Sequence, residues 1–141
     1  VFSYAYKNGV ETVLNPAPAS KPSDILFQNT SWFIPNEIEF EEIYGDVFNE
    51  KNLLLFAKNV DTNVVVTLGE KGCAYIKNNS VKIIKADSVK AIDTTGAGDA
   101  FVGAFSFALA SKLDIEECLK LALQKATDSV TKKGTQSSYK N

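Results

Sequence analysis

Apolar residues recur along the first half of the chain with two alternating spacings. Short β-prone runs indicate strands at Glu11–Leu14, Ser31–Ile34 and Asn63–Thr67. Apolar positions three and four residues apart, bounded by capping residues, indicate helices at Phe2–Lys7, Asn36–Tyr44 and Glu50–Val60. Strands and helices that alternate in this way predict an α/β fold with a mainly parallel sheet.

The pattern changes after Gly72. Two short strands, Cys73–Lys77 and Val81–Ile84, are joined by Asn78–Ser80, whose residues tolerate the positive φ of a tight hairpin. A third extended stretch is expected to end at Ile92. The sequence therefore predicts a β-hairpin added to the parallel sheet.

Two helices are expected in the last third. Ala100–Ser111 is apolar on nearly every side, which predicts a helix buried in the middle of the molecule. Asp114, with Glu117 completing a capping box, begins a second helix that Gly134 is expected to end. The apolar stripe of this second helix consists of Ile115, Cys118, Leu119, Ala122, Ala126 and Val130.

Composition narrows the class of protein. The 141 residues are 45% hydrophobic and 23% charged, with 8 Gly and 4 Pro, which indicates one ordinary soluble domain and excludes a disordered or collagen-like chain. The net charge is -2 and every cation is a lysine, so no nucleic acid is expected as partner. The apolar run Ala100–Ala110 is roughly half of the ~20 residues that a membrane helix needs, so no membrane span is expected.

The counts of three residue types exclude several kinds of site. There is no histidine, and Cys73 and Cys118 stand far apart, which excludes a zinc site, a Cys–His nucleophile and a Ser–His–Asp triad. Two unpaired cysteines fit a reducing, cytoplasmic location. Because the chain has no methionine, we expect it to be a piece of a longer polypeptide.

The segment Asp93–Phe101 carries the clearest chemical signal. Gly96 and Gly98 lie where a glycine-rich turn enters a helix, an arrangement that favours binding of a phosphate or another anion. It matches neither the dinucleotide fingerprint nor the Walker A loop. Asp99 follows the turn, and its carboxylate has two interpretations, a catalytic base or an acid that stabilises the helix N-terminus.

The chain resembles the ribokinase family of carbohydrate kinases in five motifs in the family's order. These are Asn15–Ala19, Pro35–Glu39, Thr67–Gly72, Asp93–Phe105 and Gly134–Ser138. The resemblance implies part of a three-layer α/β/α fold, with a mainly parallel sheet plus a β-hairpin. It covers the whole chain, which corresponds to the C-terminal nucleotide-binding and catalytic half of the family's domain. The N-terminal sugar-binding half and the lid are absent from residues 1–141.

The resemblance also implies a role for each motif. Asp99 would contact the sugar as the catalytic base and lie beside ATP with Gly98, while the backbone of Gly96, Ala97 and Gly98 would form the anion hole. The other nucleotide-binding positions would be Asn36, Glu39, Thr67, Gly69, Glu70, Lys71 and Gly72. Glu39 would serve Mg²⁺ as well, and K⁺ would lie among Asp93, Thr95, Ser129, Lys132, Gly134 and Ser138.

Several of these residues also have a purely structural interpretation. Asn36 and Glu39 form a capping box, Asp93 is a turn former, and Gly134 is a helix C-cap. The Thr67–Gly72 segment could simply connect a strand to the hairpin. Leu123 departs from the family, many of whose members carry Asn or His at this position near the adenine.

The function implied by the resemblance is ATP-dependent phosphorylation of D-ribose to D-ribose 5-phosphate. Two alternatives stay open: another sugar or nucleoside as the substrate, and a catalytically silent fragment that binds nucleotide. The expected partners are the sugar and ATP, and the intact parent could be a homodimer. We expect the 141 residues alone to be inactive.

Overall fold

The computed structural model describes residues 1–131 of the 141-residue chain. The chain divides into two compact units. The first comprises Val1–Leu68 and Ala74–Ile83, and the second comprises Gly69–Cys73 and the residues from Ile84 onward. Each unit is described by itself.

A five-stranded sheet organises the first unit, with strand order β1-β2-β3-β4-β5. The strands β1 (Val13–Leu14), β2 (Trp32–Phe33) and β3 (Asn63–Thr67) run parallel. In their register, Val13 lies opposite Trp32, and Phe33 lies opposite Val64. The expected parallel sheet is confirmed, although β1 and β2 are each two residues long.

The expected hairpin is also present. Strands β4 (Cys73–Lys77) and β5 (Ser80–Ile84) are joined by Asn78 and Asn79, both with positive φ (51° and 59°). Two left-handed residues favour a tight turn whose twist matches the strands. Ser80 belongs to β5 rather than to the turn, so the connection is one residue shorter than expected. A 3₁₀ turn, η1 (Gly69–Lys71), leads from β3 toward β4.

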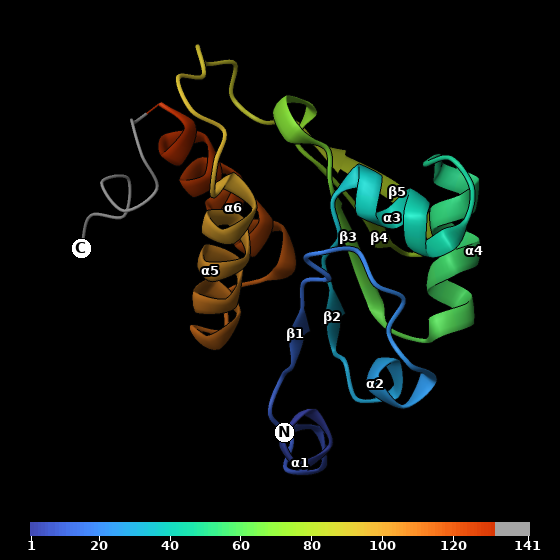
Figure 1. The fold of residues 1–141 in the computed structure, drawn as a ribbon. Helices are drawn as coiled ribbons and strands as arrows, with labels where there is room; N and C mark the ends of the chain where they lie inside the picture. The colour runs from blue at the N-terminus through green and yellow to red at the C-terminus, as the bar shows by residue number, and fades with distance from the viewer. Residues whose placement is uncertain (132–141) are drawn as a thin grey trace. The chain divides into compact units, whose positions relative to one another are not determined.

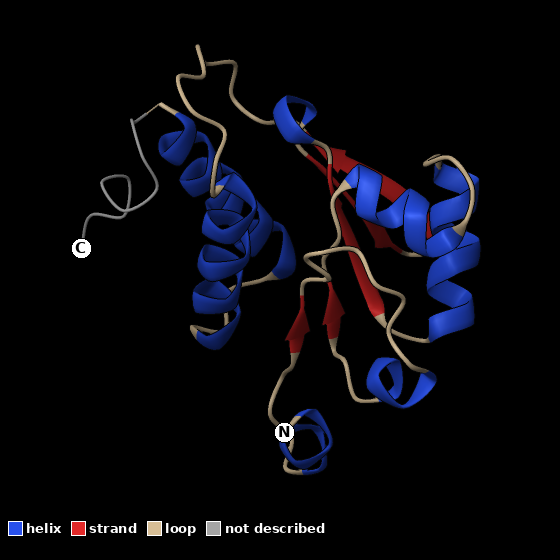
Figure 2. Cartoon of the chain, in the orientation of Figure 1, coloured by secondary structure: helices blue, strands red, loops and turns tan. Residues whose placement is uncertain are grey.

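Helices α2 (Asp24–Gln28), α3 (Glu37–Tyr44) and α4 (Glu50–Val60) cover one face of the sheet, as Figure 1 shows. The short helix α1 (Phe2–Lys7) lies near the amino end of β1. The bounds of α1 and α4 agree with the sequence pattern, and α3 begins at its expected cap, Asn36, and ends at Gly45. Figure 2 distinguishes these helices from the strands.

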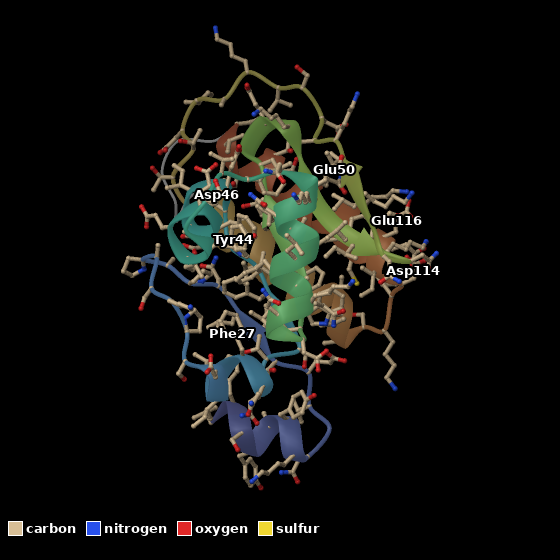
Figure 3. All side chains as sticks on the ribbon, turned by 90° about the vertical axis from the view of Figure 1, so that its right-hand side faces the viewer. Phe27, Tyr44, Asp46, Glu50, Asp114 and Glu116 are labelled. Carbon is tan, nitrogen blue, oxygen red and sulfur yellow. The ribbon has the colours of Figure 1, made fainter. Side chains whose placement is uncertain are left out.

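Aromatic side chains form the core between this helical layer and the sheet. Phe33 and Phe40 are fully buried, and both contact Phe56 of α4, with ring centroids 5.8 and 5.3 Å from it. Phe27 of α2 and Tyr44 of α3 pack against the same ring, at 6.0 and 5.9 Å. Both are labelled in Figure 3, which looks onto the helical layer. The aromatic core holds α3, whose first turn carries candidate site residues, against the sheet.

The second unit contains two helices that pack side by side, α5 (Ala97–Ala110) and α6 (Ile115–Val130) (Figure 1). Phe101 and Phe105 of α5 are buried, as are Cys118 and Leu119 of α6. Asp114 caps α6 by accepting a hydrogen bond from Glu117 N (3.0 Å). The glycine-rich turn and the expected cation loop lie at the same end of this helix pair, where α5 begins and α6 ends.

Four expectations about local structure are wrong, and one helix was not expected. The structure adds α2, which we did not predict although Ser23 caps it. Residues 85–92 form no strand. The helix α5 is not buried on all sides, because Phe107 is 68% exposed. The last helix ends at Val130 rather than at Gly134, which lies outside the described residues. Only the Asp114 side of the Asp114–Glu117 capping box forms.

The helices over residues 1–131 are all too short or too polar to span a bilayer.

Candidate active site

Three candidate residues meet at the carboxyl ends of β2 and β3. Thr67, the last residue of β3, forms a parallel bridge with Asn36, and its N–H donates to Pro35 O (3.0 Å). Glu39 lies one helical turn after Asn36 in α3. The first unit thus brings Asn36, Glu39 and Thr67 to one edge of the sheet, where parallel α/β proteins place their ligands.

The capping box at the start of α3 is formed in both directions. Glu39 N donates to Asn36 Oδ1 (2.8 Å), and Asn36 N donates to Glu39 Oε2 (2.8 Å). Asn36 is exposed and Glu39 is half-buried. The structural interpretation of this pair is therefore confirmed. It leaves the amide nitrogen of Asn36 and the second carboxylate oxygen of Glu39 unused by the box.

The packing around position 72 requires glycine there, for a reason that the sequence did not reveal. It is buried with φ +105°, and a Cβ placed on it would lie 1.9 Å from the backbone oxygen of Ile84. Its N–H closes the preceding turn by donating to Gly69 O (3.1 Å). Gly69, Glu70 and Lys71 are exposed. The absence of a side chain at Gly72 is thus required by a neighbouring backbone segment, before any nucleotide is considered.

The loop at Asp93 is tied to the end of α6. The carbonyl oxygen of Val130 accepts hydrogen bonds from Ile92 N (2.7 Å) and Asp93 N (3.1 Å). The Asp93 carboxylate accepts one from Thr95 N (2.9 Å). Ser129 is buried, and its hydroxyl donates to Ala126 O (2.7 Å). The second unit therefore brings together three of the expected cation residues, Asp93, Thr95 and Ser129.

The glycine-rich turn forms the amino end of α5. Gly96 is the N-cap residue, with φ +81°, and Ala97, Gly98 and Asp99 make up the first helical turn. The first N–H groups of a helix have no acceptor within it. Those of Gly98 and Asp99 have none elsewhere in residues 1–131. With Asp99 exposed beside them, these donors and the positive helix end can bind an anion next to a carboxylate.

An open groove of about 210 Å³ lies between α6 and the segment after β5. Leu123, buried on α6, lines it together with Lys120 and Gln124. Ile84, Lys85 and Asp87 line the other side. The sequence analysis singled out only Leu123. Residues 120, 123 and 124 share one face of a helix, and that spacing could have indicated the other two.

The described residues include only part of the expected cation site. Lys132, Gly134 and Ser138, the remaining expected cation residues, lie outside the described residues. The other expected residues are divided, with Asn36, Glu39 and Thr67 in the first unit and the rest in the second. Over residues 1–131, no three His, Cys, Asp or Glu side chains are grouped to hold a metal ion.

The two cysteines are not candidates for chemistry. Both are free and fully buried. Burial raises the pKa of the Cys73 thiol to about 12. Burial also raises the pKa of Cys118, and the negative charge of Asp114 adds to this effect. A thiol that stays protonated at neutral pH is a poor nucleophile and a poor metal ligand.

The family profile described as "pfkB family carbohydrate kinase" matches residues 1–141. The chain is 43% identical over 140 residues to the ribokinase of Haemophilus influenzae, covering 95% of this chain and 45% of the relative. It is 38% identical over 143 residues to a deoxyribokinase of Salmonella typhi, covering 96% and 46%. The chain spans about half the length of these relatives.

Solved structures agree with the sequence matches. The ribokinase of Thermotoga maritima superimposes with a TM-score of 0.84 at 34% identity, covering 96% of this chain and 48% of the other. An Arabidopsis thaliana ribokinase complexed with ribose and ATP gives 0.86 at 26%, covering 98% and 47%. A fructokinase of Vibrio cholerae with fructose, ADP and potassium bound gives 0.81 at 26%, covering 97% and 49%. The expected α/β fold class is confirmed.

Proposed function

Because the chain belongs to the pfkB family of carbohydrate kinases, we propose that it supplies the nucleotide-binding and catalytic half of an ATP-dependent sugar kinase. The observation that carries the proposal is the amino end of α5, where N–H donors with no acceptor in residues 1–131 stand beside the exposed carboxylate of Asp99. Phosphoryl transfer needs both a donor set for phosphate oxygens and an acceptor for the sugar proton.

Asp99 is the proposed general base. Its carboxylate accepts the proton of the sugar hydroxyl while that oxygen forms a bond to the γ-phosphorus, and the bond from the γ-phosphorus to the leaving ADP oxygen breaks. The anion hole expected from Gly96, Ala97 and Gly98 is shifted in this proposal by one residue, because the Ala97 N–H already donates to Thr94 O (3.3 Å). The N–H groups of Gly98 and Asp99, at the positive end of α5, stabilise the charge on the transferred group. Gly96, with φ +81°, lets the backbone turn sharply enough to expose these donors.

The nucleotide is assigned to the segment that follows β3 and to the first turn of α3. Thr67, Gly69, Glu70, Lys71 and Gly72 are the proposed contacts to its ribose and phosphates, with Asn36 and Glu39 beside the phosphates. The groove beside Leu123 is the proposed place of the base, because the apolar side chains of Leu123 and Ile84 in its lining suit a flat aromatic ring. The ATP held by the Arabidopsis thaliana ribokinase supports ATP as the phosphoryl donor.

Each of the two expected cations, Mg²⁺ and K⁺, has a suitable set of oxygen donors among the described residues. A Glu39 oxygen not used by the capping box suits Mg²⁺, which takes one or two carboxylates and keeps its other ligands as water and phosphate. Bound there, Mg²⁺ would neutralise phosphate charge. K⁺ suits carboxylate and carbonyl oxygens. The Asp93 carboxylate and the backbone carbonyls near Thr95 and Ser129 offer such oxygens. The potassium bound by the Vibrio cholerae fructokinase supports this assignment.

D-Ribose is the proposed substrate, giving D-ribose 5-phosphate. The similarity to the Haemophilus influenzae ribokinase supports ribose. The similarity to the Salmonella typhi deoxyribokinase makes 2-deoxyribose the second candidate. Both sugars carry a primary hydroxyl that Asp99 could deprotonate, so the choice between them leaves the proposed chemistry unchanged.

A chimera tests the proposal. The part of the Haemophilus influenzae ribokinase that the match leaves uncovered is joined to this chain, and ADP release is measured with ribose, 2-deoxyribose, fructose or no sugar. We expect ribose-dependent ADP release by the chimera and none by the 141-residue chain alone. A folded chimera that binds ATP without sugar-dependent turnover would contradict the proposed function.

A further inference from the structure

Asn8 and Gly9 form a chemically reactive pair that the proposed function does not use. It is the one Asn–Gly sequence among the 141 residues, and both of its residues are exposed. Asparagine is among the chemically labile residues of proteins. Because glycine has no Cβ, its backbone nitrogen can approach the preceding side chain more closely than that of any other residue. The sequence and the exposure together favour loss of the Asn8 side-chain amide.

The pair ends α1 in a turn that backbone hydrogen bonds hold closed. Asn8 is the C-cap residue, and Gly9 follows it in the left-handed region, with φ +70°. Gly9 N donates to Tyr6 O (3.0 Å), and Val10 N donates to Ala5 O (3.0 Å). These two hydrogen bonds define a Schellman motif. The backbone nitrogen of Gly9 is therefore occupied while the turn is closed.

The side chain of Asn8 is held in the same turn. Its Nδ2 donates to Tyr4 O (2.7 Å), so the turn must open before Gly9 N can reach Asn8 Cγ. Opening disrupts little packing, because no residue of α1 is buried and a Cβ at Gly9 would meet nothing within 4 Å. Segments with few buried contacts open at a low cost in free energy. We therefore expect the reaction rate to follow how often this turn opens.

We propose that Asn8–Gly9 is a modification site, at which the chain converts its own asparagine through a cyclic imide. The Gly9 nitrogen forms a bond to Asn8 Cγ as the bond between Cγ and Nδ2 breaks. The side-chain NH₂ group leaves with the proton of the Gly9 nitrogen as ammonia. Water then opens the imide. Cleavage at Cγ leaves an aspartate in a normal backbone, and cleavage at the main-chain carbonyl carbon leaves an isoaspartate, whose backbone runs through the side chain.

Either product weakens the turn that held the reacting groups apart. A carboxylate cannot donate to Tyr4 O as the amide of Asn8 does. It also places a negative charge at the C-terminal end of α1, where the helix dipole is already negative. In the isoaspartate product, the backbone gains a carbon atom, which disrupts the Schellman motif. The modification therefore opens the end of α1 irreversibly.

The proposal does not depend on the proposed kinase activity, so it is tested on the 141-residue chain without nucleotide or sugar. The chain is incubated at neutral and at mildly alkaline pH, and mass spectrometry of its peptides follows replacement of each side-chain amide by a carboxyl group. Methyl transfer by an isoaspartate methyltransferase measures the isoaspartate product. We expect the earliest product at Asn8 and a faster reaction at the higher pH, because the attacking nitrogen must lose its proton.

Two substitutions test the chemistry of the pair. Asn8→Gln should remove the product at this position, because the longer side chain forms a cyclic imide much less readily. Gly9→Ala should slow the reaction by about tenfold or more, because a Cβ hinders the approach of the nitrogen.

The consequence for the turn is measured separately. Asn8→Asp reproduces the aspartate product, and Asn8→Ser is the control that removes the amide without adding a charge. Hydrogen exchange at Gly9 N and Val10 N should be faster by about threefold or more in Asn8→Asp, and less affected in Asn8→Ser. Equal exchange in Asn8→Asp and the unmodified chain would overturn the opening of the turn.

A matched pair of helix substitutions tests the control of the rate by the turn. Ala5→Gly weakens α1 without changing the reacting residues and should speed the reaction by about threefold to fivefold. Ala126→Gly makes the same change inside α6 and should leave the rate within about twofold. The proposal is overturned by an Asn8 that stays intact while Asn79–Ser80 reacts, by equal rates in Gly9→Ala and the unmodified chain, or by equal acceleration in both alanine-to-glycine variants.

Discussion

Asn36 combines a structural and a proposed functional role in one side chain. Its side-chain Oδ1 accepts a hydrogen bond from Glu39 N, and its backbone N–H donates one to Glu39 Oε2. Asn36→Ala removes the first of these hydrogen bonds, so we expect a loss of about 1 kcal/mol in the free energy of unfolding. Urea denaturation of the 141-residue chain measures this loss.

The control for this substitution is Asn36→Ser, because serine caps helices about as well as asparagine. It should unfold within about 0.5 kcal/mol of wild type. In the chimera, the serine variant then tests the proposed contact to the phosphates, since it keeps the cap and lacks the amide. Equal stability of the alanine variant and wild type would show that the capping box contributes nothing.

Cys73 makes stability depend on pH in the alkaline range. Its thiol has a pKa of about 12 in the folded chain because it is buried, against 9.0 for an ordinary thiol. As pH rises above about 9, the unfolded chain loses this proton and the folded chain keeps it. The contribution of Cys73 is therefore present below pH 9 and declines above it, by at most about 1.4 kcal/mol per pH unit.

Comparing the chain with its Cys73→Ala variant isolates this effect. Alanine lowers stability at every pH because it leaves a cavity, so only the slopes are compared. We expect the free energy of unfolding to fall less steeply with pH in the variant, measured by urea denaturation from about pH 8 to 10. Identical slopes would mean that the Cys73 thiol has the same pKa in the folded and the unfolded chain, which would contradict this prediction.

At the scale of elements, two glycines should respond to alanine in opposite ways. At Gly72, a Cβ would lie 1.9 Å from Ile84 O and φ is +105°, so we expect Gly72→Ala to destabilise the chain by more than about 1 kcal/mol. At Gly103, inside α5, a Cβ would meet nothing within 4 Å. Gly103→Ala should stabilise it by about 0.5–1 kcal/mol. Thermal melts of both variants test this pair, and a neutral Gly72→Ala would contradict the packing described here.

Elements defined by local signals were predictable from the sequence. The helix α4 has its expected bounds, and α3 begins at a capping box that residue types alone revealed. The missed helix α2 is five residues long, too short for an apolar period to stand out, although Ser23 and Asp24 mark its start. The end of α6 at Val130 depends on hydrogen bonds from Ile92 and Asp93, which are distant in the sequence. Long-range contacts of this kind leave no local pattern.

The candidate site was predictable to a similar extent. The turn at Gly96–Asp99 was recognisable because glycines before a helix favour anion binding whatever surrounds them. Two other features of the site could not be recognised in the sequence. Gly72 is constrained by the backbone of Ile84, and Asp93 is anchored by the backbone of Val130. Any residue type could supply these backbone atoms. The groove partners of Leu123 come partly from the segment after β5, so helical spacing alone would not have given all of them.

At the scale of the whole molecule, the candidate residues are divided between two units. The first unit holds Asn36, Glu39 and Thr67, and the second holds the turn at Gly96–Asp99 and the loop at Asp93. Because the chain spans about half the length of its relatives, catalysis is best tested in the chimera, which supplies the rest of that length.

The central claim is that Asp99 is the general base, and kcat of Asp99→Asn in the chimera tests it most directly. Asparagine keeps the size of the side chain and cannot accept the proton, so kcat should fall by about 10²- to 10⁴-fold. ATP affinity should persist or rise, because a negative charge near the phosphates is removed. Asp114→Asn, which keeps a capping residue at the start of α6, is the matched control and should leave kcat unchanged. A near-wild-type kcat for Asp99→Asn, with stability lowered by about 1 kcal/mol, would contradict the account and leave Asp99 as a helix-stabilising acid.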